Sequence, residues 1–352
     1  MRIAIDAMGG DHAPEAVIEG ALLARSHCPA DLVLVGNEAL IRKALGRERE
    51  LEVVHAPQEI AMDEFGPLAI RRKRDSSLNV AMRLLAEDGV DAVLSAGNTS
   101  AIVASAKHYV GLLPGLRRAA LAVSFPTGHG RPLLLDAGAH AQADAVHLAQ
   151  SAALAHIYLK VTQGLEKPRI GLLNIGQEPG KGTRAVQRAF ALIKRSGLNF
   201  VGNIEPNDLF ADLTDAIVCE GFVGNIVLKT YEGLCEGILR ALAEKDVRSG
   251  PGDELSGVLD LFQRRYNYRF VGGAPLLGVS KPVVVAHGRS ESTAISNAIG
   301  IACGIVDEAL CAKMAEVLEH DGALAEFKYL NASLILDKLK KKWGFSTQKT
   351  EV

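Results

Sequence analysis

The chain has 352 residues, of which 48% are hydrophobic and 23% are charged, as in globular proteins with a sizeable core. Its net charge of -2 argues against a bulk electrostatic commitment to nucleic acid, so any affinity for anions must be local. No uncharged apolar run reaches the roughly 18–20 residues that cross a bilayer, and Asp6 comes too early for the apolar part of a signal peptide. We therefore expect a cytoplasmic protein.

Short apolar runs alternate with amphipathic stretches along the chain. About ten runs are predicted to be strands: Arg2–Asp6, Leu32–Gly36, Leu51–His55, Ala92–Ser95, Ala120–Phe125, Pro132–Asp136, Arg169–Asn174, Leu198–Gly202, Ala216–Glu220 and Pro282–His287. Helices are predicted at Pro14–Arg25, Ser77–Glu87, Thr99–Val110, Ala143–Lys160, Thr183–Ser196, Leu228–Glu244 and Ala294–Leu318. Runs of Val, Ile and Leu without polar alternation indicate strands covered on both faces. The alternation predicts an α/β layered sheet, and only Arg248–Gly278 breaks it, with no strand expected there.

The five cysteines are odd in number and fit neither a C-x-x-C motif nor a zinc spacing. They are Cys28, Cys219, Cys235, Cys303 and Cys311. We interpret them as small buried hydrophobic residues in a reducing compartment.

Six of the predicted strands end in a glycine beside a hydrogen-bonding side chain. These ends are Asp6–His12, Ser95–Ser100, Asp136–His140, Asn174–Glu178, Glu220–Asn225 and His287–Ser290. In open α/β sheets, ligands bind in the crevice beyond the carboxyl ends of the strands. The pattern therefore predicts a crevice lined with exposed backbone amides.

Ser95–Ser100 is the strongest candidate for an anion site. Gly97 permits a tight turn, and Thr99 begins a helix whose free amides and positive dipole end would face the crevice. Ordinary capping of this helix by Asn98 or Thr99 is the alternative.

Asn174–Thr183 resembles two nucleotide motifs without satisfying either. It lacks the P-loop spacing, and Gly182 follows Lys181 where a P-loop has Ser or Thr. Gly180–Ala185 fits G-x-G-x-x-A, with Glu205 about 20 residues on. Residues 175–179 separate it from the strand end, so a dinucleotide site is disfavoured. Lys181 is either an anion anchor or a solvated lysine.

Two histidine-bearing segments are candidates for chemistry. His140, Asp144 and His147 would share one helical face, as a metal site, a proton-transfer pair or simply a polar helix start, and no HExxH-like template supports metal. His287 could protonate a leaving thiolate while Arg289 grips phosphate. The alternative for His287 is a bond to backbone at a strand end.

Basic residues cluster in Arg71–Arg74 and in Lys338–Trp343. Both are either solvated faces or docking points for an acidic protein or anionic lipid. Arg71–Arg74 precedes a helix-cap signal and is expected to border the crevice. A separate apolar stripe, Leu255, Val258, Leu259 and Phe262, flanked by Arg264 and Arg265, is a core, dimer or membrane face.

Taken together, the motifs resemble the phosphate acyltransferase family (PlsX) of bacterial phospholipid synthesis. They are IAIDAMGGDHAPE, RDSS, LSAGNTS, LLNIGQEPGKGT, FVGNIEPND, EGFVGNIVLKT, GGAPLLGV and AHGRSESTAISNAI, in order from residue 3 to about 300. The resemblance implies transfer of an acyl group from acyl-acyl carrier protein to orthophosphate, which feeds glycerol-3-phosphate acyltransferase. It further implies a homodimer, a peripheral membrane contact and no cofactor or metal.

The fold implied by this resemblance is a three-layer α/β/α arrangement similar to isocitrate and isopropylmalate dehydrogenases. It has a mixed, mostly parallel sheet of about ten strands in one catalytic unit of two intertwined subdomains. We predict residues 1–130 with 281–340 for one subdomain and 131–280 for the other, which includes a protruding helical segment, 248–278.

The sequence departs from the family pattern at several crevice positions. Ser100 stands where glycine is usual, His140 where asparagine is usual, and Gln142 where aspartate is common. Gln177 replaces a frequent glutamate, and Glu220 and Val223 replace aspartate and threonine. Most keep a polar group, so we expect activity to survive.

For the reaction, we expect phosphate on the Ser95–Thr99 turn, with Lys181 or Arg289 neutralising its charge. Amides near Gly9, Gly10 or Gly138 would serve the thioester oxygen, and His287, or second His12, would protonate the thiolate. The remaining predicted substrate-binding residues are Asp6, Gly97, Asn98, Asp136, Asn174, Gly176, Asn225, Lys229, Gly288 and Ser290. A nicotinamide-dependent dehydrogenase and a non-catalytic membrane-docked scaffold are the alternatives.

Overall fold

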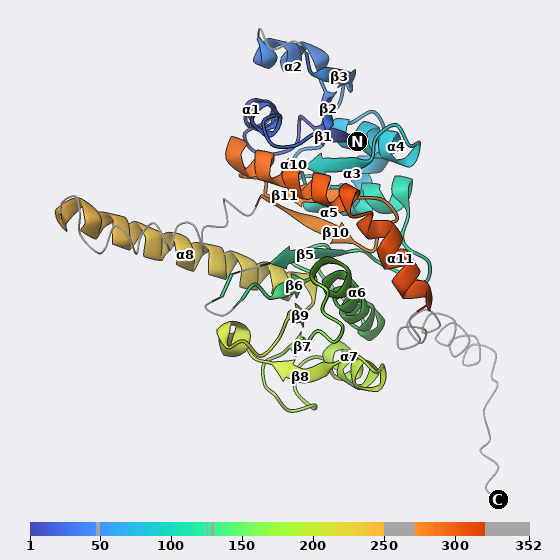
Figure 1. Cartoon of the computed structure of the whole chain (residues 1–352), viewed down its shortest axis with the longest axis vertical. Coiled ribbons are helices and arrows are strands. Elements are labelled where there is room, and N and C mark those ends of the chain that lie inside the picture. The colour runs from blue at the N-terminus through green and yellow to red at the C-terminus, as the bar shows by residue number, and fades with distance from the viewer. Residues whose placement is uncertain (47–49, 125, 128–129, 250–271, 321–352) are drawn as a thin grey trace, which may run out of the picture.

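The computed structural model describes residues 1–46, 50–124, 126–127, 130–249 and 272–320 (Figure 1). Its strands are β1 (Arg2–Asp6), β2 (Asp31–Gly36), β3 (Glu52–His55), β4 (Ala92–Ser95), β5 (Ala120–Ser124), β6 (Leu133–Leu135), β7 (Ile170–Leu173), β8 (Phe200–Ile204), β9 (Ala216–Val218), β10 (Gly273–Leu277) and β11 (Val283–Ala286). Its helices are α1 (Glu15–Ala24), α2 (Glu38–Leu45), α3 (Gly66–Arg72), α4 (Ser77–Ala86), α5 (Thr99–Ser105), α6 (Ala145–Gln163), α7 (Arg184–Arg195), α8 (Gly221–Ser249), α10 (Ser292–Asp307) and α11 (Leu310–His320). A π-helical turn, η1 (Ala106–Val110), continues α5, and a 3₁₀ turn, η2 (Pro206–Phe210), follows β8.

The strands form a single 11-stranded sheet in the order β3-β2-β1-β4-β11-β10-β5-β6-β9-β7-β8. Seven of the ten pairings are parallel, and the three that involve β10 or join β5 to β6 are antiparallel. As a result, β6, β7, β8 and β9 run opposite to β1, β2, β3, β4 and β11. Carboxyl ends of these two groups of strands therefore lie at opposite edges of the sheet.

Helices cover both faces of the sheet, which gives the predicted three-layer α/β/α arrangement. One face packs against α1, α10, α6, α7 and α11, where α1 lies along α10 and α6 lies along α7 and α11 (Figure 1). The other face packs against α3, α4, α5, η1 and the first turns of α8. Alternate residues of each strand feed the two cores, as with Ile3 and Ile5 on one side and Ala4 on the other.

Local sequence explains where several helices begin. Asn37, Ser76, Asn98, Asp144 and Thr183 each precede a helix and accept a hydrogen bond from a backbone amide of its first turn. The starts of these helices, including α5 just beyond β4, are thus set by capping side chains.

All ten predicted strands are present with small shifts of their ends, but the expectation of no strand in Arg248–Gly278 is wrong. β10 occupies Gly273–Leu277 and pairs antiparallel with both β11 and β5. Pro275 and the adjacent glycines made this segment resemble a loop. α2 and α3 were also missed, α8 begins at Gly221 rather than Leu228, and the long C-terminal helix is two helices that break at Ala309, whose φ is 50°.

Other predictions fall partly outside the described residues. The apolar stripe from Leu255 to Phe262, most of the helical segment 248–278 and the basic tail Lys338–Trp343 lie there. The division into two subdomains stays a prediction. Among the described helices, none is by itself long and apolar enough to cross a membrane, while the bent pair α10 and α11 meets that test together by length and composition.

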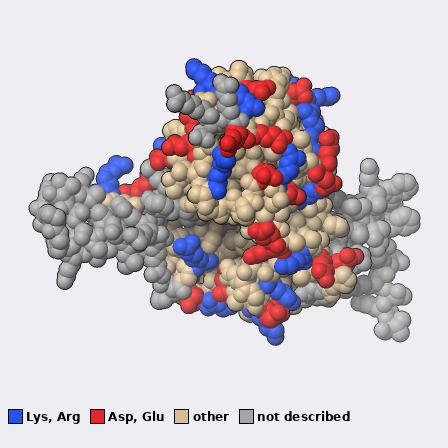
Figure 2. Space-filling model, turned by 45° about the horizontal axis from the view of Figure 1, so that its top comes forward, with Lys and Arg blue, Asp and Glu red and all other residues tan. Residues whose placement is uncertain are grey.

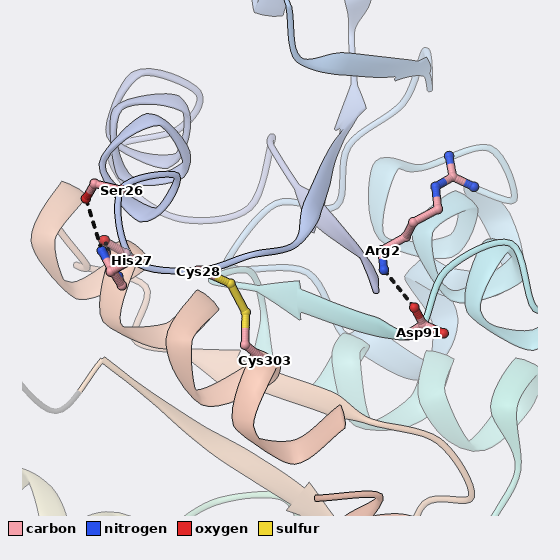
Figure 3. The surroundings of a disulfide bond; sticks show 7 residues. Arg2, Ser26, His27, Cys28, Asp91 and Cys303 are labelled. Atoms are coloured by element: carbon pink, nitrogen blue, oxygen red, sulfur yellow. Dashed lines mark hydrogen bonds between the residues drawn. A yellow bond between two sulfur atoms is a disulfide. The ribbon is translucent and has the colours of Figure 1, made fainter. Parts of the chain in front are cut away.

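The interpretation of all five cysteines as unpaired is wrong for two of them. Cys28, just after α1, forms a disulfide with Cys303 of α10 (Figure 3). Cys219 and Cys235 are free and buried, as predicted, and Cys311 is free and partly exposed. A separation of 275 residues hid the pair, because sequence spacing carries no signal for partners brought together by the packing of α1 on α10.

Candidate active site

A cavity of about 410 Å³ lies on the sheet face that α5 and α8 cover. Its floor is apolar and comes from the central strands and α8, through Leu121, Val123, Ala274, Val285 and Leu228. Its polar side chains are Asp11, Thr99, Ser124, Asn225, Lys229, Tyr231, Glu232, His287 and Arg289. An apolar cleft of this size with a few convergent polar groups is typical of a ligand site.

The first turns of α8 connect the two edges of the sheet. Gly221 and Gly224 pack so closely on the loop after β6 that a side chain would collide with His140 or Asp136. From there α8 crosses the sheet face until Glu232 lies beside His287, at the carboxyl end of β11. Gly224 and Glu232 are eight positions apart, which is about 12 Å along a helix. The cavity is therefore a groove between α8 and the central strands, with Asn225 near one end and Glu232 near the other.

His287 is held in one tautomer by its own loop. Its Nδ1 accepts a hydrogen bond from the backbone N–H of Arg289 at 3.1 Å, so the neutral ring carries its proton on Nε2. Nε2 lies 3.9 Å from Oε2 of Glu232. Burial, followed by the charges of Lys229 and Arg289, lowers the pKa of His287. The ring is thus prepared as a neutral Nε2–H donor rather than as an imidazolium acid.

Glu232 is the acidic member of this end of the cavity. Its side chain is 13% exposed, and burial raises its pKa, while Lys229 acts in the opposite direction. Lys229 and Glu232 are three residues apart on α8, so both point from the same helix face. The groove therefore contains the cations Lys229 and Arg289 together with His287 and a carboxyl whose pKa is raised.

Asp6 and Ser95 form a buried framework behind the cavity. Ser95 Oγ donates a hydrogen bond to Asp6 at 2.7 Å and accepts one from the amide of Gly97 at 3.1 Å. Burial raises the pKa of Asp6. The loops after β1 and β4 approach so closely that a side chain at Gly9 would collide with Asp6 and the Gly97 amide. These predicted ligands hold loops together and do not line the cavity.

Asn98 and Ser100 support the segment that borders the cavity mouth. The Asn98 amide nitrogen donates to the carbonyls of Met62 and Glu64 at 3.0 and 2.7 Å, and its oxygen accepts from the Ala101 amide and the Ser100 hydroxyl. Ser100 Oγ also accepts from the Gly66 amide at 3.2 Å. The Asn98 side chain therefore caps α5, which was the alternative to ligand binding in the sequence analysis. Ser100, one of the departures, adds a bond between α5 and α3.

Seven of the predicted site residues line the cavity: Thr99, Gly138, Asn225, Lys229, His287, Gly288 and Arg289. Gly10 lies just behind it, with a φ of 111°, beside the carbonyl of Gly288. His12 is exposed and does not line the cavity, and Ser290 is buried beneath it. Asp136 accepts the amides of Gly138 and Ala139 at 3.2 and 2.6 Å, so it shapes the loop instead of facing the groove.

Asn174, Gly176 and Lys181 form a separate loop at the end of β7. The Asn174 side chain is used inside this loop, accepting from the Ile175 amide and donating to the Lys181 carbonyl. β7 is six strands away from β4, which is about 29 Å at the usual spacing between strands. The structure therefore does not bring Lys181 to the Ser95–Thr99 turn.

Asp144 and His147 stabilise the start of α6. Asp144 accepts the amides of Val146 and His147, and His147 Nδ1 accepts the Asp144 amide, which together make a capping box. Burial and nearby arginines lower the pKa of His147 to about 4. Within the described residues, no group of three or more His, Cys, Asp or Glu side chains could hold a metal ion.

Sequence reasoning missed Glu232, Asp11 and the apolar floor. Glu232 follows Asn225 and Lys229 at helical spacing, so an earlier start for the predicted helix would have placed all three on one face. Leu121 and Val123 were not identifiable, because a buried strand run does not reveal which stretch of it a cavity leaves uncovered.

Comparisons with known proteins show the family to which the chain is similar. The family described as "Fatty acid synthesis protein" matches residues 1–313. The chain is 59% identical to a phosphate acyltransferase of Syntrophobacter fumaroxidans, covering 98% of this chain and 99% of the relative, and 43% identical to one of Thermoanaerobacter pseudethanolicus, covering 92% and 98%.

Solved structures resemble the chain at the level of the fold. A phosphotransacetylase from Streptococcus pyogenes matches with a TM-score of 0.60 at 15% identity, covering 88% of this chain and 94% of the other. A 4-hydroxythreonine-4-phosphate dehydrogenase described from Salmonella typhimurium matches with a TM-score of 0.50 at 15% identity, covering 86% and 98%. Both support the three-layer fold with its mixed sheet.

Proposed function

Because this chain belongs to the phosphate acyltransferase family of fatty acid synthesis proteins, we propose that it transfers an acyl group from acyl-acyl carrier protein to orthophosphate. The observation that carries the proposal is the groove, where Thr99, Lys229, His287 and Arg289 meet an apolar floor. Cations suit phosphate, and the floor suits an acyl chain. The dehydrogenase alternative rests on a 15% identical likeness of fold, which carries no activity.

Phosphate is placed at the polar end of the groove. Arg289 can bind two phosphate oxygens side by side, and Lys229 adds a second positive charge from α8. Thr99 is the first residue of α5, where backbone amides have no acceptor within the helix. Held there, phosphate attacks the thioester carbon beside His287.

His287 serves the thioester oxygen in this scheme. A neutral Nε2–H donor stabilises the oxyanion that forms on attack, and its lowered pKa keeps the ring neutral. As the carbon–sulfur bond breaks, the proton of the hydrogen phosphate passes to the departing thiolate. The products are the acyl phosphate and the free carrier thiol, so atoms and charge balance without an acid from the protein. This scheme replaces the role of thiolate acid given to His287 from the sequence.

The reaction is tested by incubating the protein with palmitoyl-acyl carrier protein, with and without orthophosphate. Released thiol and acyl phosphate trapped as a hydroxamate are measured together. Thiol release that depends on phosphate and equals hydroxamate supports the transfer. Equal thiol release without phosphate indicates a thioesterase, and no release with an active carrier contradicts the proposal.

We extend the proposal to assembly and location. Two pairs of exposed apolar residues on α8, Phe222 with Ile226 and Leu234 with Ile238, support a contact between two copies of this chain. Sedimentation across a concentration range tests this homodimer.

The proposed location follows from the substrates. The acyl carrier protein and the use of acyl phosphate for phospholipids are consistent with a cytoplasmic enzyme at the inner face of the membrane. There it would pass acyl phosphate to a glycerol-3-phosphate acyltransferase. Cell fractionation tests that location.

A further inference from the structure

One surface beside the cavity combines exposed apolar and basic side chains. It consists of Met62, Phe65, Leu68, Arg71 and Arg72, and is called the α3 surface below. Its three apolar side chains are 44%, 72% and 43% exposed. Arg71 and Arg72 are also exposed. Exposed apolar patches mark interaction sites, and Met, Phe and Arg are enriched at protein–protein interfaces.

The α3 surface is continuous with the mouth of the cavity. Met62 lines the cavity, and its methyl group lies against Gly288, between His287 and Arg289. Asn98 and Ser100 hold this segment through bonds to Met62, Glu64 and Gly66. A partner bound to α3 would therefore sit where a substrate arm enters.

The positive charge of the α3 surface comes from two arginines that are not neutralised by ion pairs among the described residues. Lys73 pairs with Glu64, and Arg83 pairs with Asp75. Arg71 and Arg72 form no ion pair with any residue the structure describes. Figure 2 shows Lys and Arg mixed with Asp and Glu over the face in view, and the net charge is -2, so the protein as a whole does not attract an acidic partner.

Arg71 and Arg72 also stabilise the end of α3, but this effect does not explain the exposed apolar side chains beside them. Cations in the last turn of a helix offset its dipole, and Arg71 and Arg72 occupy the last turn of α3. That effect does not require Phe65 and Leu68 to be exposed beside them. The combination instead matches a partner that presents acidic residues around an apolar spot.

We propose that the α3 surface docks the acidic carrier protein, so that its acylated arm enters the cavity past Met62. This rests on the proposed function and adds the place where the substrate's protein part binds. Arg71 and Arg72 speed the encounter and set its orientation, while Phe65 and Leu68 supply apolar contact. The thioester carbon then reaches His287 from the mouth of the groove.

The test compares an acyl carrier protein with acyl-N-acetylcysteamine, a thioester that lacks the protein. Arg71→Glu/Arg72→Glu is expected to raise KM for the acyl carrier protein roughly tenfold or more, with kcat and the kinetics of the small thioester unchanged. In wild type the carrier KM rises with salt, and in the variant this dependence flattens. Phe65→Ala, at a mostly exposed position, raises the carrier KM without changing its salt dependence.

Arg184→Glu/Arg188→Glu is the matched control, because both arginines are exposed on α7. It should leave the carrier KM as in wild type. Equal losses on both thioesters, or an unchanged carrier KM in the α3 variant, overturn the proposal. So does an α3 variant that loses only binding to phosphatidylglycerol vesicles, which assigns the surface to lipid.

Failure of the proposed function gives a different result. Wild type would then transfer the acyl group from neither thioester. Titration of carrier protein against wild type and the α3 variant, followed by fluorescence anisotropy, would still show whether the surface binds it.

Discussion

Two loops of this protein carry the same sequence features and have different surroundings. His287–Ser290 after β11 and Asn174–Lys181 after β7 both combine glycine, a hydrogen-bonding side chain and a cation at the end of a buried strand. The first opens into the cavity, whereas the second is bonded within itself. Direction and distance together explain the difference. The carboxyl end of β7 lies at the other edge of the sheet from that of β11, and β7 is five strands away from β11. The loop after β6 lies at the same edge as the β7 loop but nearer the centre of the sheet, and its Gly138 lines the cavity. Strand-end chemistry thus identifies candidates, and topology selects among them.

The largest expected effect is on kcat, and it comes from substituting His287 in the loop after β11. His287→Ala should lower kcat roughly 100- to 1,000-fold, the usual loss when one oxyanion donor is removed. KM for phosphate should change little, because His287 faces the thioester. His287→Gln keeps an N–H donor and should recover part of the loss. Steady-state kinetics with both substrates varied provide the measurement, and a variant that keeps most of its kcat contradicts the role.

A second pair of variants compares the cations of the two loops. Arg289→Ala should raise KM for phosphate roughly 10- to 100-fold, as expected when a charge-assisted hydrogen bond worth about 1.5–3 kcal/mol is lost. Lys181→Ala, at the other edge, should change it by no more than about twofold, as surface substitutions usually do. A large effect of Lys181 with none of Arg289 would move the phosphate site to the β7 loop.

The pH dependence of kcat tests whether His287 acts as a neutral hydrogen-bond donor. Its pKa is lowered from 6.5 by burial, Lys229 and Arg289, so the ring stays neutral at pH 7 and the acid limb of kcat lies below 6.5. Lys229→Ala removes a cation, raises this pKa and moves the acid limb upward, which makes the variant lose a larger share of its kcat at pH 6. The ionisation of phosphate itself is the same for both enzymes. An acid limb that does not move indicates another titrating group.

The smallest effect on activity is expected from the disulfide, which lies on the opposite face of the sheet. Cys303→Ser should lower the free energy of unfolding by roughly 2–5 kcal/mol and leave kcat of the folded enzyme unchanged. Thermal unfolding of wild type with and without reductant gives the same comparison without a substitution. Unchanged unfolding in both experiments would mean that the two thiols are not joined in the protein as purified.

Much of the fold was predictable because buried parallel strands have an unmistakable composition. Runs such as Arg2–Asp6 and Ala92–Ser95 appear where expected, and the caps Ser76 and Thr183 begin helices within one residue of the prediction. β10 was not predictable from its own residues. It becomes a strand because β11 and β5 offer it hydrogen bonds on both sides.

The candidate site was predictable in part for the same reason. His287, Arg289 and Thr99 follow strands that run together, so the rule about carboxyl ends applies to them. It does not apply to Asn174, because the antiparallel pairings at β10, β5 and β6 reverse the second half of the sheet and β7 lies five strands away from β11. Glu232 comes from a helix that crosses the sheet face, and no strand-end pattern could indicate it.

The bond between Cys28 and Cys303, which are 275 positions apart in the sequence, closes most of the chain into one covalent ring. β1 lies in the short tail before the ring, yet it pairs between β2 and β4, which the ring contains. A protease that cuts once anywhere inside the ring opens it without releasing a piece. Such a nicked molecule keeps its full mass on a denaturing gel until reductant separates the two halves.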